Sequence, residues 1–462
     1  MDIINLSKSC VKCAKCVPSC TIYQIHRDES TSPRGFVDLL ALCEKGDLTL
    51  DKNLKNIFES CFLCTTCTTQ CPQNIDTATM IIKSRIAIAQ KYGISWYKRA
   101  YFFLLRHRKI MDFVFSLTHF IAPCAFKSDD DRLRSRFALS TFGKRTIFPF
   151  AKKSFLNKYK HYKFSPRHCE DLAQIQSNQN VKDSPKDSHE STSANPKDSP
   201  KDSRESTSAN PKKVAIFIGC LSNYNYTEVG DSLITILERL NIEAIIPKQE
   251  CCAAPAYFTG DIKSVVHLIK KNIALFEGFW SEIDAMIIPE ATCAAMIMVD
   301  WKHALELSDE VEKSAWIARL ERLLPKIYMA SDYLYRHTNL REMLKDSPKS
   351  RESITYHDPC HAKKVLGVYK EPRDLLGANY EIIEMAECDR CCGFGGVTMQ
   401  SQKYGFAHSA GVAKAQNIAK SGANIVSAEC SACRMQLNNA MDNNGVQTRF
   451  KHPLELVAKA LE

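Results

Sequence analysis

The stretch Cys391-Cys392-Gly393-Phe394-Gly395-Gly396 decides how this chain is interpreted. Two adjacent cysteines before a glycine-rich turn suit a purely structural role poorly, because free thiols oxidise when exposed. They are understandable if both sulfurs bind one metal cluster and the backbone must approach it closely, which glycine permits. Further cysteines flank the pair at long range, with Cys360 before it and Cys430 and Cys433 after it. The sequence therefore predicts a metal centre here.

Length and cysteine content fit a metalloprotein of several domains. The chain has 462 residues and 21 cysteines, so we expect three or four folded units. Residues 1–5 lack the basic and apolar regions of a signal peptide, which favours a reducing compartment over a disulfide scaffold. No apolar run reaches the roughly 18 residues of a membrane-spanning helix. Clustered cysteines in such a chain indicate metal ligands.

Two cysteine clusters in residues 1–90 share one spacing, Cys10-x2-Cys13-x2-Cys16-x3-Cys20 and Cys61-x2-Cys64-x2-Cys67-x3-Cys71, the second followed by Pro72. In the bacterial two-cluster arrangement, the fourth cysteine of each run binds the other cluster. One 4Fe–4S cluster is therefore assigned to Cys10, Cys13, Cys16 and Cys71, and the other to Cys61, Cys64, Cys67 and Cys20. Zinc is the alternative, although it usually prefers two separated Cys-x2-Cys pairs.

The segment 91–170 accounts for the basic balance of the chain, whose net charge is +10. It contains 18 lysines and arginines against 5 acidic residues. Apolar spacing predicts a helix over Ile75 to Ala89, and we expect residues 96–126, which are rich in aromatics, to be helical as well. The helices of residues 96–126 either pack in the core or lie on a surface that binds anionic lipid or an acidic partner.

Residues 182–211 form a tandem repeat, in which KDSPKDSHESTSANP recurs with His189 replaced by Arg204. A truncated copy stands at residues 345–353. The repeats have almost no apolar residues, so we expect them to be disordered and to lie outside folded units.

Two halves with a matching plan follow the repeat. Cys220 and Cys251 are separated by 30 residues, as are Cys360 and Cys391, which argues for an internal duplication. Apolar runs alternate with helical patterns, which predicts parallel α/β units with cysteines at the carboxyl ends of strands. Strands are expected at residues 213–220, 244–247, 285–289, 380–385 and 424–427, and a helix from about Phe406.

The predicted fold is an α+β, ferredoxin-like helical two-cluster domain followed by a duplicated α/β cysteine-rich domain. The predicted domains are a two-cluster 4Fe–4S ferredoxin-type domain (1–90), a basic helical connector (91–170), a disordered tandem-repeat linker (171–212), a first cysteine-rich half (213–344), a repeat-derived loop (345–353) and a second cysteine-rich half (354–462).

The two halves differ in their candidate ligands. The second half keeps five, namely Cys360, Cys391, Cys392, Cys430 and Cys433, whereas the first half keeps four, Cys220, Cys251, Cys252 and Cys293. In the first half Ala253 replaces the glycine after the pair, and Glu290 replaces the first cysteine of the Cys-x2-Cys pair. We expect a further iron–sulfur cluster in the second half, and zinc, a cluster or an empty site in the first. Cys43, Cys124, Cys169 and Cys388 remain, with Cys388 close enough to the pair to be an alternative ligand or a redox-active thiol.

The chain resembles a known family of iron–sulfur subunits. The resemblance is carried by the two cysteine clusters, the stretch Asp28-Glu29-Ser30-x2-Pro33-Arg34-Gly35 between them, the pattern Cys…Cys-Cys-Gly…Cys-x2-Cys, and Tyr356-His357-Asp358-Pro359-Cys360-His361. It is similar to the iron–sulfur subunit of glycolate oxidase, and to the related subunits of anaerobic glycerol-3-phosphate dehydrogenase and heterodisulfide reductase. In the last, such domains carry noncubane 4Fe–4S clusters. His357 and His361 either tune a cluster by hydrogen bonds to sulfur or pack the turn, and Arg34 either lies near a cluster or is a plain turn residue.

The resemblance implies an electron-transfer subunit. The sequence has no dinucleotide fingerprint and no phosphate-binding loop, so a flavin is expected only in a partner, an FAD-containing 2-hydroxy acid oxidase subunit. Electrons would pass toward the membrane quinone pool, with no nucleic acid among the partners. We expect a cytoplasmic protein, or one attached peripherally to the inner face of the membrane. The alternatives are a glycerol-3-phosphate dehydrogenase subunit, a heterodisulfide-reductase-like catalytic subunit that reduces a disulfide at Cys391, and a zinc-stabilised protein that binds nucleic acid or lipid.

Overall fold

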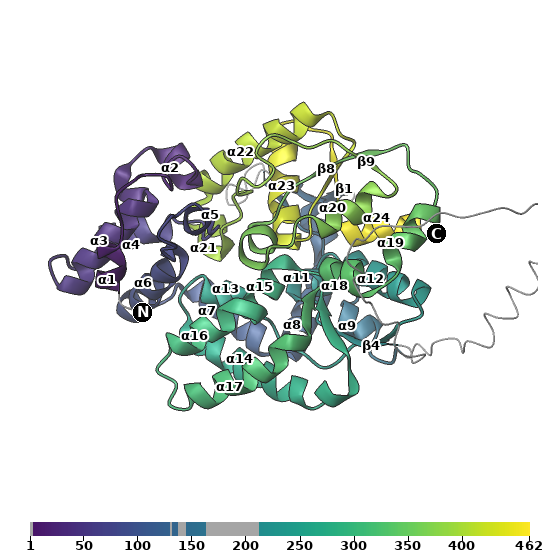
Figure 1. Ribbon diagram of the computed structural model, residues 1–462, viewed down its shortest axis with the longest axis horizontal. Coiled ribbons are helices and arrows are strands. Elements are labelled where there is room, and N and C mark those ends of the chain that lie inside the picture. The colour runs from purple at the N-terminus through teal and green to yellow at the C-terminus, as the bar shows by residue number, and fades with distance from the viewer. Residues whose placement is uncertain (1–2, 130–131, 137–144, 163–211) are drawn as a thin grey trace, which may run out of the picture.

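The computed structural model describes residues 3–129, 132–136, 145–162 and 212–462. The tandem repeat and Cys169 lie outside these residues. In Figure 1 the N-terminal helices lie against one side of a larger body, which is formed by the two cysteine-rich halves.

Residues 3–92 are helical, with α1 (Ile3–Lys8), α2 (Thr21–His26), α3 (Pro33–Lys45), α4 (Lys52–Glu59), α5 (Thr66–Thr69) and α6 (Thr77–Tyr92). Side-chain caps explain where several of them begin. The hydroxyl of Ser32 accepts from the Gly35 backbone N–H at 3.0 Å, and Asp76 accepts from that of Thr79 at 3.1 Å. No strand occurs in these described residues, so the expected ferredoxin-like α+β character is not confirmed.

The connector is helical only in its first part, where α7 (Trp96–Arg106) and α8 (Arg108–Ala125) match the expected helices. After them, β1 (Phe126–Asp129), β2 (Arg132–Ser135) and β3 (Thr146–Ile147) form an antiparallel sheet, and a short helix α9 (Phe155–Lys158) follows. The expectation of a helical segment to residue 170 was therefore wrong at this sheet. Its anchor is non-local, because the Thr146 backbone N–H donates to Asn439 Oδ1 at 3.1 Å.

Each cysteine-rich half contains a four-stranded parallel sheet. The first has the order β5-β4-β6-β7, with β4 (Lys213–Ile216), β5 (Glu243–Ile245), β6 (Ala285–Ile288) and β7 (Ile327–Met329). The second has the order β9-β8-β10-β11, with β8 (Ser353–Tyr356), β9 (Glu381–Ile382), β10 (Ile425–Ser427) and β11 (Arg449–Lys451). The identical order, strand for strand, confirms the duplication. The fourth strand of each sheet was not expected.

Helices cover both sheets. Those of the first half are α11 (Cys220–Tyr224), α12 (Glu228–Arg239), α13 (Ala254–Tyr257), α14 (Ile262–Glu277), α15 (Ala291–Ala295), α16 (Trp301–Glu306), α17 (Lys313–Leu323), α18 (Ala330–His337) and α19 (Leu340–Asp346). Those of the second are α20 (Glu371–Gly377), α21 (Gly396–Ser401), α22 (Tyr404–Ser421), α23 (Ser431–Asn443) and α24 (Pro453–Ala460). The truncated repeat copy runs from the end of α19 into β8, and the Asn379 side chain donates to the carbonyls of Ser347 and Pro348, so the expectation that this copy is disordered was wrong.

Two buried apolar clusters hold these parts together. One lies between the halves and includes Ile216, Leu237, Ile354 and Leu456. The other continues from the N-terminal helices into both halves, and Phe58 of α4 belongs to it together with residues of α14 and α21. The N-terminal unit therefore shares its core with the cysteine-rich halves, which fixes its cysteines relative to theirs.

A buried arginine strengthens this junction. Arg85 of α6 donates to the carbonyl of Cys61 at 2.6 Å and to that of Phe258, in the first half, at 2.8 Å. Beside it, a Cβ on Gly260 would lie 2.3 Å from the Arg85 carbonyl oxygen, so the backbones approach too closely for any side chain there.

Candidate iron–sulfur sites

The structure brings together the four cysteines assigned to the first cluster. Cys10, Cys13, Cys16 and Cys71 line one cavity of about 30 Å³. Arg34 also lines this cavity, and its Nε donates to Glu29 Oε1 at 2.5 Å. Arg34 therefore lies beside the candidate cluster site, which favours the functional interpretation over a plain turn residue. Four thiols around one small cavity fit a 4Fe–4S cluster.

The second set of four is likewise gathered around one cavity. Cys20, Cys61, Cys64 and Cys67 line a space of about 20 Å³, with Cys20 reaching it from the other cysteine run. Burial raises the pKa of Cys20 to about 12 and that of Cys61 to about 11. Buried thiols with such pKa values bind a metal only with loss of their protons, which a cluster's positive iron ions favour. Cluster ligation at both sets stays a prediction.

Cys64 lies at the contact between the N-terminal unit and the second half. Cys64 lines the same cavity as Cys360 and Cys391, and hydrogen bonding by these two thiols holds the pKa of Cys64 well below its ordinary value. The loop that carries Cys64 also supplies Phe62 and Leu63 to the wall of the second-half cavity. No sequence pattern indicated this contact, because it depends on how two domains dock.

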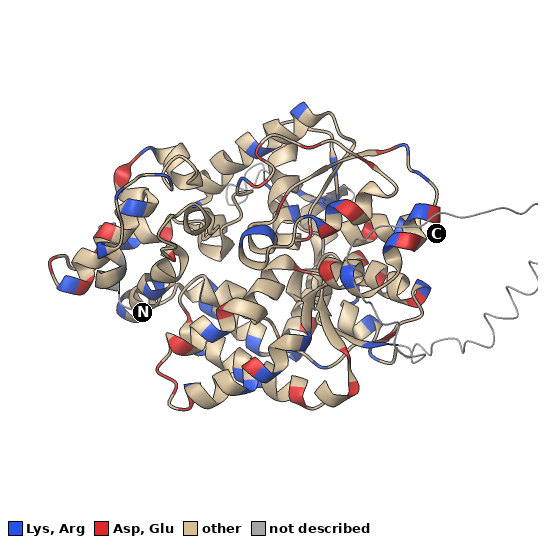
Figure 2. Cartoon of the chain, viewed as in Figure 1, with Lys and Arg blue, Asp and Glu red and all other residues tan. Residues whose placement is uncertain are grey.

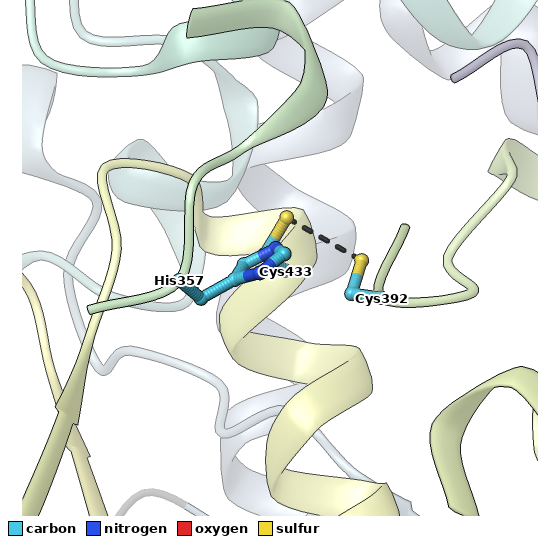
Figure 3. A group of neighbouring side chains, drawn as sticks. All are labelled: His357, Cys392 and Cys433. Carbon is cyan, nitrogen blue, oxygen red and sulfur yellow. Dashed lines mark hydrogen bonds between the residues drawn. The ribbon is translucent and has the colours of Figure 1, made fainter. Parts of the chain in front are cut away.

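The five cysteines of the second half surround a cavity of about 70 Å³. They are Cys360, Cys391, Cys392, Cys430 and Cys433, which follow the carboxyl ends of β8, β9 and β10, with Cys433 in the first turn of α23. The sulfurs of Cys392 and Cys433 are 3.4 Å apart. Figure 3 shows His357 beside these two cysteines, and one nitrogen or sulfur atom from each of the three lies within 4.8 Å of the others. The donor set fits an iron–sulfur cluster and has one thiol more than the four that bind an ordinary 4Fe–4S cluster.

Two of the glycines after the cysteine pair lie where a side chain would meet neighbouring elements. Gly393 has φ +92°, and a Cβ there would lie 2.7 Å from Ala410 Cβ of α22. A Cβ on Gly395 would lie 2.8 Å from Phe62 Cδ1. The glycines therefore allow close packing of α22 and the N-terminal unit, and Gly395 and Gly396 also line the cavity among the cysteines.

Two lysines lie among the second-half cysteines, and the sequence analysis missed both. Lys364 Nζ donates to Thr66 Oγ1 at 2.5 Å, and nearby Cys360, Cys64 and Cys391 counter the effect of its burial, so that its pKa is raised. Lys414 is fully buried and donates to the carbonyls of Glu387 and Cys388 at 2.7 and 2.9 Å. Burial lowers its pKa to about 8. Positive charge here would offset the negative charge of a thiolate-bound cluster.

The four cysteines of the first half also come together. Cys252 and Cys293 have sulfurs 3.2 Å apart, while Cys220 and Cys251 are hydrogen-bonded through their thiols. Glu290, which replaces a cysteine, is buried and turns its carboxylate toward the second half. There it accepts from the backbone N–H of Ser431 at 2.9 Å and from the Ser431 hydroxyl, while the hydroxyl of Ser222, in the first half, also donates to it. Glu290 thus links the two halves, a role its sequence position did not indicate.

The remaining cysteines are not gathered with these sets in the described parts of the chain. Cys124 is exposed and Cys43 is half-buried. Cys388 Sγ lies 3.4 Å from Asp358 Oδ2, and its carbonyl accepts from His357 Nδ1 at 3.1 Å. Cys388 therefore contacts His357 through its backbone carbonyl, while its thiol donates to Asp358. His361 stacks on Phe258 with ring centroids 5.5 Å apart.

Comparison with known proteins agrees with this arrangement. The family model for the 4Fe-4S dicluster domain matches residues 7–75, and that for the cysteine-rich domain matches residues 214–298 and again 354–438. The chain carries a 4Fe–4S dicluster domain and two cysteine-rich domains. These domains support iron–sulfur clusters and a redox role as an iron–sulfur subunit.

The similar proteins are named for lactate utilization or for fumarate reduction. Lactate utilization protein A 2 of Bacillus cereus (strain Q1) is 28% identical over 254 residues, which are 54% of this chain and 99% of that protein. Lactate utilization protein A of Halalkalibacterium halodurans is 28% identical over 251 residues, 53% of this chain and 96% of that protein. A fumarate reductase (CoM/CoB) subunit of Methanothermobacter marburgensis is 30% identical over 253 residues, 54% of this chain but 46% of that longer protein. The expected link to glycolate oxidase in particular is not shown by these relatives.

Proposed function

We propose that this chain is the iron–sulfur electron-transfer subunit of a flavin-dependent oxidoreductase that oxidises a 2-hydroxy acid. The position of Cys64 carries the proposal, because Cys64 lines both the second N-terminal cavity and the cavity of Cys360 and Cys391, and so joins the two sites. Two-electron oxidation of a 2-hydroxy acid needs a flavin to divide the electron pair, and this chain supplies centres that accept electrons singly. The flavin belongs to a partner subunit.

The substrate class rests on the relatives. Lactate utilization proteins resemble the chain over nearly their whole length, and lactate and glycolate are both 2-hydroxy acids. Lactate is therefore the first substrate to test and glycolate the second. The sequence resemblance to glycerol-3-phosphate dehydrogenase makes glycerol 3-phosphate the third.

Anaerobic purification with iron and sulfide analysis tests the proposal. The two N-terminal sites account for about eight iron atoms, and a filled second-half site adds more. Cys391→Ser should lower the count while the EPR signal of the Cys10 cluster persists, whereas Cys43→Ser, outside all three sites, should leave the count unchanged. Zinc in place of iron would contradict the proposal and favour a zinc-stabilised binding protein.

A second candidate is reduction of a disulfide at the second-half site. The cavity among the five cysteines favours it, as does the similarity to a fumarate reductase subunit named for CoM and CoB. One disulfide would take two electrons and two protons and leave as two thiols. A change in the EPR signal of the second-half site on addition of a thiol, absent in Cys391→Ser, would distinguish this activity from electron transfer alone.

We further propose that electrons pass on to membrane quinone and that α8 lies on the bilayer surface. Ile110, Phe113, Leu117, Phe120 and Ile121 form a stripe on one face of α8, each between 43% and 68% exposed. The one acidic residue in α7 and α8, Asp112, accepts from the Tyr224 hydroxyl at 2.7 Å. An apolar stripe on helices with so little negative charge suits an anionic bilayer. In Figure 2, elsewhere on the chain, basic and acidic residues are interspersed.

Flotation with vesicles that contain phosphatidylglycerol tests this attachment. No helix in the described ranges combines the length and apolar character needed to cross a membrane, so the stripe would lie in the plane of the surface. Phe113→Ser with Phe120→Ser should reduce vesicle binding at least about tenfold, since each phenylalanine contributes roughly 1.5–3 kcal/mol when buried. Val311→Ser, which alters a 96% exposed apolar residue elsewhere, is the control. Equal binding by both variants would refute the attachment.

A further inference from the structure

His357 is held in one tautomer. Its ring is fully buried, and Nδ1 lies 3.1 Å from the carbonyl oxygen of Cys388. A carbonyl oxygen can only accept, so Nδ1 carries the proton. The same oxygen also accepts from Lys414 Nζ at 2.9 Å, so the carbonyl fixes the ring from one side. Nε2 therefore presents a lone pair and no proton.

Because Nδ1 is taken by the Cys388 carbonyl, Nε2 is the nitrogen left for the neighbouring sulfurs. Nε2 is buried without a hydrogen-bond partner, and the ring stands beside Cys392 and Cys433, all three residues being buried (Figure 3). A buried acceptor left unpaired costs about 1–3 kcal/mol, so the arrangement is unfavourable unless something fills it. A neutral imidazole that donates its other N–H to a backbone carbonyl has the arrangement that metal-binding histidines show.

The first half offers an internal comparison. The residue at the matching distance before Cys220 is Phe217, which is buried and has no ligand atom. Both halves thus bury an aromatic ring at this position, but only the half with five cysteines places a nitrogen there. The two halves therefore differ at this position in whether the buried ring offers a ligand atom, as they differ in their number of cysteines, and not in whether a ring is buried.

We propose that His357 Nε2 binds iron at the second-half site, together with Cys392 and Cys433. The inference rests on the proposed function, since it needs an iron–sulfur centre there. It replaces the expectation that this histidine donates a hydrogen bond to sulfur, because a ring protonated on Nδ1 has no proton on Nε2. A nitrogen ligand among thiolates raises the reduction potential of a cluster, as in Rieske centres.

Pulsed EPR on full-length protein labelled with ¹⁵N-histidine tests the assignment. In a paramagnetic state of the second-half cluster, a directly bound imidazole should give a strong nitrogen coupling that changes from the ¹⁴N to the ¹⁵N pattern on labelling. His357→Phe, which copies the first half, should abolish the coupling. His361→Phe, at the neighbouring ring that lines the same cavity, should retain it.

The outcomes separate this inference from the proposed function. No labelled-histidine coupling in the wild-type protein, or its survival in His357→Phe, would overturn the ligand assignment while leaving the electron-transfer role intact. Absence of iron from the second-half site would overturn both. If His357→Phe fails to assemble the site, the comparison of labelled and unlabelled wild-type protein still decides the question.

Discussion

Replacement of Lys364 by methionine should lower the reduction potential of the N-terminal cluster that includes Cys64. Lys364 Nζ is 2.5 Å from Thr66 Oγ1, and that hydroxyl is 3.3 Å from Cys64 Sγ, so the ammonium lies no more than about 6 Å from this sulfur. A positive charge so close stabilises the reduced state, which carries one more electron. With an effective dielectric constant near 20, the attraction at this distance is about 3 kcal/mol, or about 120 mV for one electron.

The measured shift should be smaller than this limit. The added electron is spread over the whole cluster, and Lys364 is partly exposed to solvent, so we expect a decrease of roughly 50–100 mV. An EPR-monitored redox titration measures it. Lys364→Arg keeps the charge and should stay near the wild-type potential.

Lys370→Met is the matched control, because it removes the same charge from an exposed side chain of the following loop. Its potential should change by less than about 20 mV, since solvent screens exposed charges. Equal shifts in the Lys364→Met and Lys370→Met variants would refute the reasoning, as would a Lys364→Met potential that matches wild type.

Three further predictions concern stability. Gly393→Ala should lower the free energy of unfolding by at least about 2 kcal/mol, because Gly393 has φ +92° and an added Cβ would lie 2.7 Å from Ala410 Cβ. Thermal unfolding measures this loss, and Gly405→Ala, at an open position in a helix, should leave stability unchanged or slightly raised. Arg85→Met should lower the free energy of unfolding by about 3 kcal/mol or more, because it leaves the carbonyls of Cys61 and Phe258 unpaired, and Arg85→Lys should not restore it. Limited proteolysis measures separation of the domains, and resistance of Arg85→Met equal to that of the wild type would contradict the role of Arg85 at this junction. Burial raises the pKa of Glu429 to about 8, so its contribution to stability is complete below the ordinary value of 4.5 and is lost as pH rises through 8. Glu429→Gln should therefore flatten the fall of the unfolding temperature between pH 5 and 8, and an unchanged slope would refute this.

The cysteine pattern allowed much of the arrangement to be predicted. Equal spacing between Cys220 and Cys251 and between Cys360 and Cys391 indicated the duplication, and the two sheets share one strand order. The crossed grouping, in which Cys20 joins the second run and Cys71 the first, follows from the spacing of each run. Both features can be predicted from one sequence, because each depends only on local spacing or on repetition.

The features that were missed depend on tertiary packing. Strands β7 and β11 have three residues each, too few for an apolar pattern to identify. The antiparallel sheet of residues 126–147 is held by Asn439, almost 300 positions away in sequence. The positions of Cys64 against Cys391 and of Glu290 against Ser431 arise only when domains dock. A sequence pattern identifies ligands by their type, and the docked fold decides which sets touch.

The central claim is that the N-terminal cluster at Cys64 and the second-half centre form one electron path through touching ligands. EPR of the anaerobic protein, poised so that both centres are paramagnetic, measures their magnetic interaction directly. Adjacent centres should give spin–spin splitting or broadening that disappears in Cys391→Ser, while the signal of the Cys10 cluster persists. Two independent spectra, each unaffected by the other centre's redox state, would contradict the account.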